Sequence, residues 1–192
     1  AKVDMITFDG AGGGTGYSPN KMMNEWGLPT VILEEAVCTF VNKLKAEDCW
    51  VPAITMTGGF STEDQVFKSL AYGNGMVTAI GLCRAAMAAA LVGKQVGEMI
   101  EVQNLSKHWK KYGNSVEELF GDLPDLRAIY GKKADDFSLG AVGVFSYLNK
   151  IGFGLRHFAA LNRKFDISDW DRSDLIPLTQ KAKDLVQGRW FD

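Results

Sequence analysis

Short apolar runs alternate with longer amphipathic segments through the first half of the chain. Three runs, residues 3–8, 51–56 and 76–80, are apolar and rich in β-branched side chains, and glycine follows each of them within a few positions. Runs of this length that end in turn residues are typical of buried β-strands. The pattern therefore predicts three short strands, each followed by a glycine-containing loop.

Helical patterns separate these strands. Residues 19–26 predict a short helix that ends at Gly27, and an amphipathic helix is expected to begin at Pro29 and Thr30. A hydroxyl and a carboxylate three positions apart, Ser61 and Asp64, predict a capping box for a helix that ends near Gly73. An alanine-rich helix over about residues 82–92 follows the third strand. Strands and helices in alternation predict a parallel β/α architecture.

After about Gly93 the pattern becomes helical only. Ser115 and Glu118 form a second capping-box pattern, residues 137–161 predict a pair of glycine-bearing apolar helices, and residues 173–187 predict a last helix. Three βα units cannot close a barrel, because a (β/α)₈ barrel needs roughly 250 residues. The sequence thus leaves two possibilities, a small open sheet or the last part of a barrel whose beginning lies elsewhere.

Composition limits the class of protein. The chain has 192 residues, 46% of them hydrophobic, and a net charge of −2 without a block of like charge, which argues against nucleic acid or an acidic membrane as partner. The longest apolar run, residues 85–92, falls short of the roughly 20 residues that a membrane span needs. The start of the chain does not read as a signal peptide, and three cysteines at unrelated spacings favour reduced thiols in a cytoplasmic protein.

The candidate chemistry lies in the loops after the strands, since ligands of parallel α/β proteins bind beyond the carboxyl ends of the strands. The first loop begins at Asp9 and has five glycines in residues 10–16. Backbone without side chains can approach a ligand closely and present N–H groups to it, although a flexible turn would have the same composition. The spacing is neither the dinucleotide fingerprint nor a P-loop, which would need a lysine.

The second and third loops suggest an anion site. Gly58 and Gly59 precede a helix whose N-terminal amides could bind phosphate, and Gly81 with the amides of Leu82 and Cys83 opens the next helix. Two neighbouring helix N-termini at the end of a βα series are typical of the phosphate site that follows strands seven and eight of a barrel.

These motifs resemble those of a known family. Residues 3–30, with the pattern Asp-Gly-x-x-Gly-Gly-Thr-Gly, resemble the segment after the sixth strand in the FMN-binding domain of glutamate synthases. Residues 53–87 are similar to the seventh and eighth strands of that family, and residues 158–179 resemble the C-terminal tail of standalone glutamate-synthase-like FMN proteins. The likeness is strongest over residues 3–92 and 151–180.

The resemblance implies a fold, a cofactor and a set of site residues. Residues 1–93 would be the last three βα units of a TIM-type (β/α)₈ barrel that binds FMN, and residues 94–192 a helical C-terminal extension packed on the barrel. The flavin phosphate would lie on one group of residues, and a second group would face the flavin ring or the substrate. The first group is Gly58, Gly59, Gly81, Leu82 and Cys83, and the second is Asp9, Gly13, Gly14 and Thr15.

The activity that the resemblance implies is reductive transfer of ammonia to 2-oxoglutarate or a similar 2-oxo acid. This chain would supply the flavin-phosphate half of the site, and the N-terminal barrel half would come from another chain or fragment, within an oligomer. Large glutamate synthases carry three cluster-binding cysteines just after the eighth strand, whereas residues 84–101 contain none. We therefore expect no iron–sulfur cluster there, and no metal site elsewhere.

Two other functions remain open. The chain could be a non-catalytic βα assembly subunit, or its phosphate site could hold another phosphorylated ligand, since the fold alone does not define the ligand. His108 is expected to lie on a solvated helix face, and His157 to be a packed or capped imidazole, with a proton donor as the alternative. The aspartates of residues 166–174 are expected to form a turn and a helix cap. Arg84 is either a phosphate partner or a surface charge.

Overall fold

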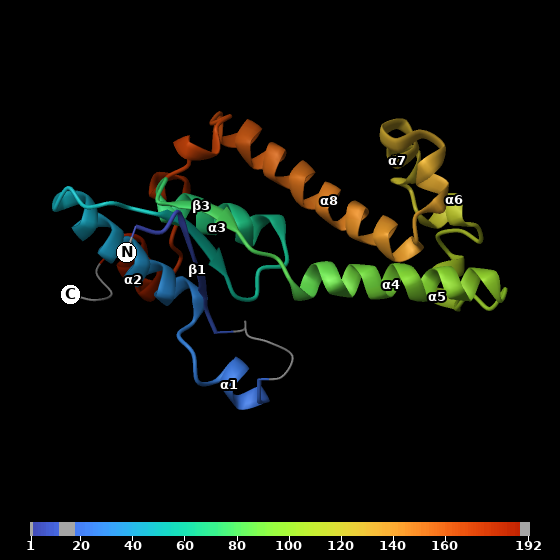
Figure 1. The fold of residues 1–192 in the computed structure, drawn as a ribbon, viewed down its shortest axis with the longest axis horizontal. Helices are drawn as coiled ribbons and strands as arrows, with labels where there is room; N and C mark the ends of the chain where they lie inside the picture. The colour runs from blue at the N-terminus through green and yellow to red at the C-terminus, as the bar shows by residue number, and fades with distance from the viewer. Residues whose placement is uncertain (1, 12–17, 189–192) are drawn as a thin grey trace. The chain divides into compact units, whose positions relative to one another are not determined.

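The computed structural model describes residues 2–11 and 18–188 and has an α/β fold with a three-stranded parallel sheet (Figure 1). The strands lie in the order β1-β2-β3, with Met5 of β1 opposite Ala53 of β2 and Ile54 of β2 opposite Val77 of β3. Their bounds are Met5–Asp9 for β1, Ala53–Thr57 for β2 and Val77–Ile80 for β3. All three strands were predicted from the sequence, and each begins one or two residues later than expected.

Helices make up most of the remaining described chain. They are α1 (Asn20–Asn24), α2 (Thr30–Ala46), α3 (Glu63–Gly73), α4 (Arg84–Glu101), α5 (Lys107–Lys110), α6 (Val116–Leu119), α7 (Leu123–Tyr130), α8 (Leu139–Asn162) and α9 (Gln180–Val186). Three 3₁₀ segments, η1 (Gly131–Asp136), η2 (Ile167–Asp169) and η3 (Arg172–Asp174), join them.

The chain forms two compact units. The first consists of residues 1–82 and 154–192, and the second of residues 83–153. This division differs from the sequence-based boundary near residue 93 in two ways: α4 belongs to the second unit, and the end of α8 with the segment after it belongs to the first. Phe158 of α8 and Trp170 are among the side chains that pack in the core of the first unit.

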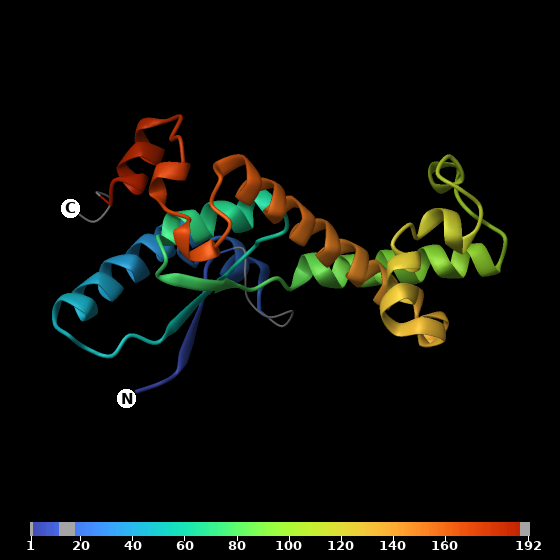
Figure 2. The same cartoon turned by 90° about the horizontal axis from the view of Figure 1, so that it is seen from above.

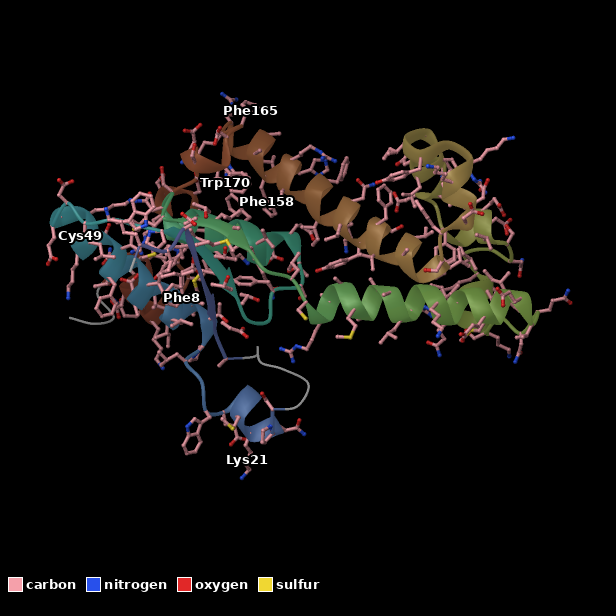
Figure 3. All side chains as sticks on the ribbon, in the orientation of Figure 1. Phe8, Lys21, Cys49, Phe158, Phe165 and Trp170 are labelled. Atoms are coloured by element: carbon pink, nitrogen blue, oxygen red, sulfur yellow. The ribbon has the colours of Figure 1, made fainter. Side chains whose placement is uncertain are left out.

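Helices α2 and α3 cover one face of the sheet, on the same side as the segment after residue 154 (Figure 2). Ile54 and Met56 of β2 point into this layer and are buried. The ring of Phe67 on α3 stacks on Phe158 at 4.6 Å between centroids and meets Trp170 edge-on at 5.0 Å; Figure 3 labels these two partners. Burial of these large apolar groups is the main stabilising contribution in the first unit.

The opposite face of the sheet is not covered by the described residues of the first unit. Strand register places on it Met5, Thr7 and Asp9 of β1, Ala53, Thr55 and Thr57 of β2, and Ala79 of β3. Met5 is 61% exposed, and the other residues on this face are exposed or half-buried. Parallel sheets normally have both faces covered, so this small-residue, threonine-rich face is unusual for a free sheet.

In the second unit, α4 packs closely on residues 139–153 of α8. A Cβ added to Gly143 would lie 2.6 Å from the carbonyl oxygen of Ala89, and one added to Gly140 would lie 2.9 Å from that of Ala90. Absence of side chains at these positions thus lets the two helix backbones come together. A second core forms around them from Val96, Phe120, Leu123, Leu126, Ala134 and Val142.

Two helix predictions are wrong in detail. Residues 137–161 were expected to form a pair of helices, but α8 is continuous, because its packing outweighs the roughly 1 kcal/mol that each helical glycine costs. The last helix was expected over residues 173–187, but α9 begins only at Gln180. Pro177 explains this difference, since proline cannot donate the helical hydrogen bond and disfavours helical backbone before it.

Of the two predicted capping boxes, one is confirmed and one is shifted by a residue. Ser115 accepts a hydrogen bond from the backbone N–H of Glu118, as expected. At α3, however, the box consists of Thr62 and Gln65 rather than Ser61 and Asp64. An amide side chain serves at the fourth position as well as a carboxylate does, and Gln65 accepts from the N–H groups of Ser61 and Thr62.

Candidate functional site

The carboxyl ends of the three strands lie together at one edge of the sheet, where hydrogen bonds join the loops. The N–H of Gly10 donates to the Thr57 carbonyl at 3.0 Å, and the N–H of Gly81 donates to the Met56 carbonyl at 2.8 Å. The Thr57 hydroxyl in turn donates to the Gly81 carbonyl at 3.2 Å. The three glycine loops that the sequence singled out are therefore adjacent in space, and we call Gly10, Gly58, Gly59 and Gly81 the glycine edge.

Gly58 occupies a position that other residues cannot take without strain. Its φ of +119° lies outside the range of ordinary side-chain-bearing residues, and Gly59 follows with a φ of +88°. A Cβ on Gly58 would lie 2.7 Å from the Gly10 nitrogen. The Thr30 hydroxyl donates to the Gly58 carbonyl at 2.6 Å, which holds the loop against the start of α2.

Backbone amides are the donors that this edge offers to a ligand. Within the described residues, the N–H groups of Gly59 and Phe60 have no acceptor, whereas the Gly81 N–H is already bonded to Met56. Gly81 therefore contributes its small size rather than a donor. Sequence reasoning missed Phe60, and its position directly after the Gly-Gly pair and before the cap of α3 is the signal that could have found it.

The N-terminus of α3 is less suited to an anion than the sequence suggested. Glu63 and Asp64 lie in its first turn, and Gln65 already accepts from amides at this helix end. Hydrogen bonds from Lys68 and from the Thr62 hydroxyl lower the pKa of Asp64, so that its carboxylate stays charged at neutral pH. A phosphate here would have to be held by the loop amides and not by the helix end.

The other predicted site residues are placed as follows. Asp9 ends β1 opposite Thr57 and is exposed on the uncovered face of the sheet. Leu82 is half-buried and packs against the core of the first unit. Cys83 is exposed, belongs to the second unit and precedes α4. Gly13, Gly14 and Thr15 lie outside the residues that the structure describes.

The structural role expected of the aspartates is confirmed. Asp166 and Asp171 each accept from a backbone N–H two residues on, and Lys164 bridges Asp171 and Asp174 at 2.9 and 2.8 Å. His108 has ring contacts with Trp109 and Tyr112. Over residues 2–11 and 18–188, no group of three or more metal-ligating side chains lies close enough to hold an ion.

The helices are also informative about membranes. Among those described, none combines the length and the apolar character that crossing a bilayer requires. The α/β class that the sequence predicted is confirmed by the parallel sheet and its covering helices.

Comparison with known proteins relates the first half of the chain to glutamate synthases. Residues 1–93 match the family model described as the conserved region in glutamate synthase. The glycine edge and the whole three-stranded sheet fall inside the matched residues, so this part of the chain is similar to the conserved region of glutamate synthases, as its motifs indicated. No curated protein and no solved structure matches the chain.

Proposed function

We propose that this protein is part of an FMN-dependent oxidoreductase of the glutamate synthase type, which transfers ammonia reductively to 2-oxoglutarate or a similar 2-oxo acid. The chain would supply the half of the site that holds the flavin phosphate. The observation that carries the proposal is the glycine edge, in which three loops are hydrogen-bonded together within a region that matches the glutamate synthase family.

The residues present fit a phosphate group. Gly58 leaves no room for a side chain, and the N–H groups of Gly59 and Phe60, which have no acceptor among the described residues, can donate to an anion. Bound flavin would supply the redox chemistry, and the chain would hold it and orient the substrate. Asp9 and the Thr57 hydroxyl lie at the same edge on the uncovered face, where they could contact the flavin ring or the 2-oxo acid.

Further strands are expected to complete the sheet. β1 and β3 each pair with β2 alone, so each has one edge without a partner among the described residues. Unpaired edges and an uncovered face are features that parallel sheets normally avoid. A TIM-type barrel would pair both strand edges and cover the open face, with the N-terminal barrel half supplied from outside residues 1–192 by another chain or fragment.

A barrel that binds a different phosphorylated ligand is the second candidate. The donors at the glycine edge are backbone amides, which recognise a phosphate but not the group attached to it. A non-catalytic assembly subunit is the third function that the test below distinguishes.

The test is flavin retention in the protein purified with its associated polypeptides. Native mass spectrometry and an absorbance scan should show a second polypeptide, or a longer form of the chain, together with FMN. Gly59→Asp adds a carboxylate beside the donor amides and should lower FMN affinity at least about tenfold by charge repulsion. Gly75→Asp is the matched control, because Gly75 also has a positive φ of +71°, and a Cβ there would lie in ordinary van der Waals contact, 3.7 Å from the Ser168 carbonyl oxygen.

Each outcome has a clear meaning. Equal FMN binding by the two variants would place the phosphate elsewhere. Binding of another phosphorylated compound in preference to FMN would support the second candidate. Colourless material that binds neither would overturn the enzyme proposal in favour of an assembly subunit.

A further inference from the structure

A cavity of about 560 Å³ lies in the first unit on the helix-covered side of the sheet. Its walls are the first turns of α2, the loop after β2, one face of α3, Phe158 of α8 and the segment 174–186. This size is typical of sites for small organic molecules. The cavity touches Gly58, Gly59 and Phe60 of the proposed phosphate site but is otherwise built from residues to which the proposed function gives no contact with the ligand.

Most of the cavity wall is apolar. The lining side chains of this kind are Val31, Phe60, Phe67, Phe158, Leu175, Ile176, Pro177, Leu178, Ala182, Leu185 and Val186. Ile176 and Leu178 are 84% and 91% exposed, respectively, although they lie at the rim of a hydrophobic cavity. An apolar ligand body would therefore find contacts both on the walls and at the rim.

Most of the polar side chains around the cavity already have partners. The Thr30 hydroxyl donates to Gly58, Lys68 pairs with Asp64 at 2.7 Å, and Asp174 pairs with Lys164 at 2.8 Å. The Tyr72 hydroxyl lies 2.5 Å from Glu35 and 3.0 Å from the Leu185 carbonyl. Gln65 accepts at the cap of α3.

Glu34 is the exception. It lines the cavity, is only 2% exposed, and in the described chain its carboxyl is hydrogen-bonded by the Ser69 hydroxyl alone, at 2.8 and 2.9 Å from its two oxygens. A hydroxyl carries one proton, so the two contacts share a single donor. In the described chain the ionised form of Glu34 therefore has one proton for two carboxylate oxygens.

The guanidinium of Arg172 donates no hydrogen bond to the Glu34 carboxylate. Arg172 donates to Glu35 at 2.8 Å, to the Tyr72 carbonyl at 2.9 Å and to the Val186 carbonyl at 3.2 Å. Burial, with a smaller contribution from the charge of Glu35, raises the pKa of Glu34 to about 8, against the opposing effects of Ser69 and Arg172. Cys38 on the same helix is also buried, and its pKa is raised to about 12, so it adds no charge at neutral pH.

We propose that this cavity binds a small organic cation with an apolar body, an alkylammonium or arylalkylammonium, whose ammonium group pairs with Glu34. An ammonium supplies both the charge and the donors that the carboxylate lacks, and the apolar walls accept the rest of the molecule. The proposal rests on the cavity and on Glu34, and it holds whether or not the chain is part of a flavoenzyme.

The test is a titration of the purified protein with 2-phenylethylammonium, followed by calorimetry and by NMR shifts of the cavity-lining methyl groups. Binding should tighten about tenfold per pH unit between pH 6 and 7.5, because the cation selects the ionised carboxylate. 2-Phenylethanol, which has the same body without the charge, should bind at least about tenfold more weakly. FMN retention is measured on the same samples, so that the two proposals are judged separately.

Glu34→Gln keeps the size of the side chain and an acceptor for Ser69 but removes the charge. It should weaken ammonium binding at least about tenfold and abolish its pH dependence. Glu47→Gln, an exposed change just after the same helix, should leave binding unchanged. If Glu34→Gln does not fold, the pH series and the uncharged analogue decide the question with the unaltered protein.

Three results would overturn the proposal. They are ammonium binding that does not vary with pH, equal affinity for the ammonium and the alcohol, and shifts that map outside the cavity. Equal binding by the Glu34→Gln protein would have the same consequence, as would the absence of any binding.

Discussion

Arg172 shows how single residues hold the first unit together. Its guanidinium stacks on the Tyr72 ring at 4.3 Å and pairs with Glu35, which is only 3% exposed on its side chain. It thereby attaches the segment after α8 to both α2 and α3. A buried carboxylate of this kind depends on its partner, because an unpaired charge in the protein interior is costly.

Arg172→Met should therefore destabilise the first unit strongly. We expect a loss of about 3 kcal/mol or more in the free energy of unfolding, since Glu35 would be left buried without its cation. Arg127→Met is the matched control: Arg127 also pairs with two carboxylates, Glu117 and Asp135, but on the surface, so its loss should cost about 1 kcal/mol or less. Urea unfolding followed by fluorescence measures both, and equal losses would contradict the argument.

Glu34 predicts a pH dependence of stability with a definite sign. Its pKa is about 8 in the folded protein and near 4.5 in the unfolded chain, so the folded state holds an extra proton between these values. Stability should therefore fall as the pH rises from about 4.5 to 8, by up to about 1.4 kcal/mol per pH unit from this group. Unfolding curves at pH 5.5 and 7.5 measure the effect, and Glu34→Gln should lose that part of the slope. An unchanged slope in the variant would show that Glu34 ionises normally.

At the scale of elements, the features that depend on neighbours in the sequence were predicted, whereas those that depend on tertiary packing were not. The strands and the glycine loops were found from short apolar runs and turn residues, which depend on neighbours in the sequence. The continuity of α8 depends on its packing contacts. The late start of α9 depends on Pro177, which lies within a longer helical pattern. The return of residues 154–188 to the first unit, through Phe158 and Trp170, involves partners about a hundred residues apart, which no local pattern encodes.

The sequence predicted the glycines of the candidate site but not which of its groups are available to a ligand. Gly58, Gly59 and Gly81 were identified because glycine after a strand is a strong local signal, and the structure brings their loops together. Which amides are free to bind a ligand could not be predicted, since the Gly81 N–H is occupied by Met56 on the neighbouring strand. The buried Glu34 was also missed, because a glutamate on an amphipathic helix is normally expected to face solvent.

Close packing of α4 on α8 leads to a prediction for the second unit. Alanine favours a helix over glycine by about 1 kcal/mol, so Gly143→Ala would stabilise an isolated helix. In this protein it should instead destabilise, by about 1–3 kcal/mol, because its Cβ would meet the Ala89 carbonyl. Gly121→Ala is the control, since a Cβ there has nothing within 4 Å. Thermal unfolding compares the two, and a stabilised Gly143→Ala protein would show that the helices are farther apart.

At the scale of the whole molecule, the uncovered sheet face is the feature that most needs a partner. Apart from Met5, its residues are small or polar, and the strand edges beside it are unpaired among the described residues. Large apolar side chains under a layer of helices are typical of the outer face of a barrel wall, which would put the barrel interior on the uncovered side. Within the described residues of the first unit, the helices therefore cover only the face that would be the outside of a barrel.

Met5 on this face provides a direct test of completion by further strands. Met5→Glu should be harmless if the face is in contact with water, because Met5 is 61% exposed in the chain alone. If other strands close a barrel over it, the new carboxylate becomes buried and unpaired, and the purified assembly should dissociate or lose more than about 4 °C in its unfolding midpoint. Met87→Glu on α4, where the side chain is 53% exposed, is the matched control and should change neither property. We expect light scattering to show dissociation, or thermal unfolding to show a lower midpoint, for the Met5 variant alone. Two indistinguishable variants would mean that the sheet functions with this face open.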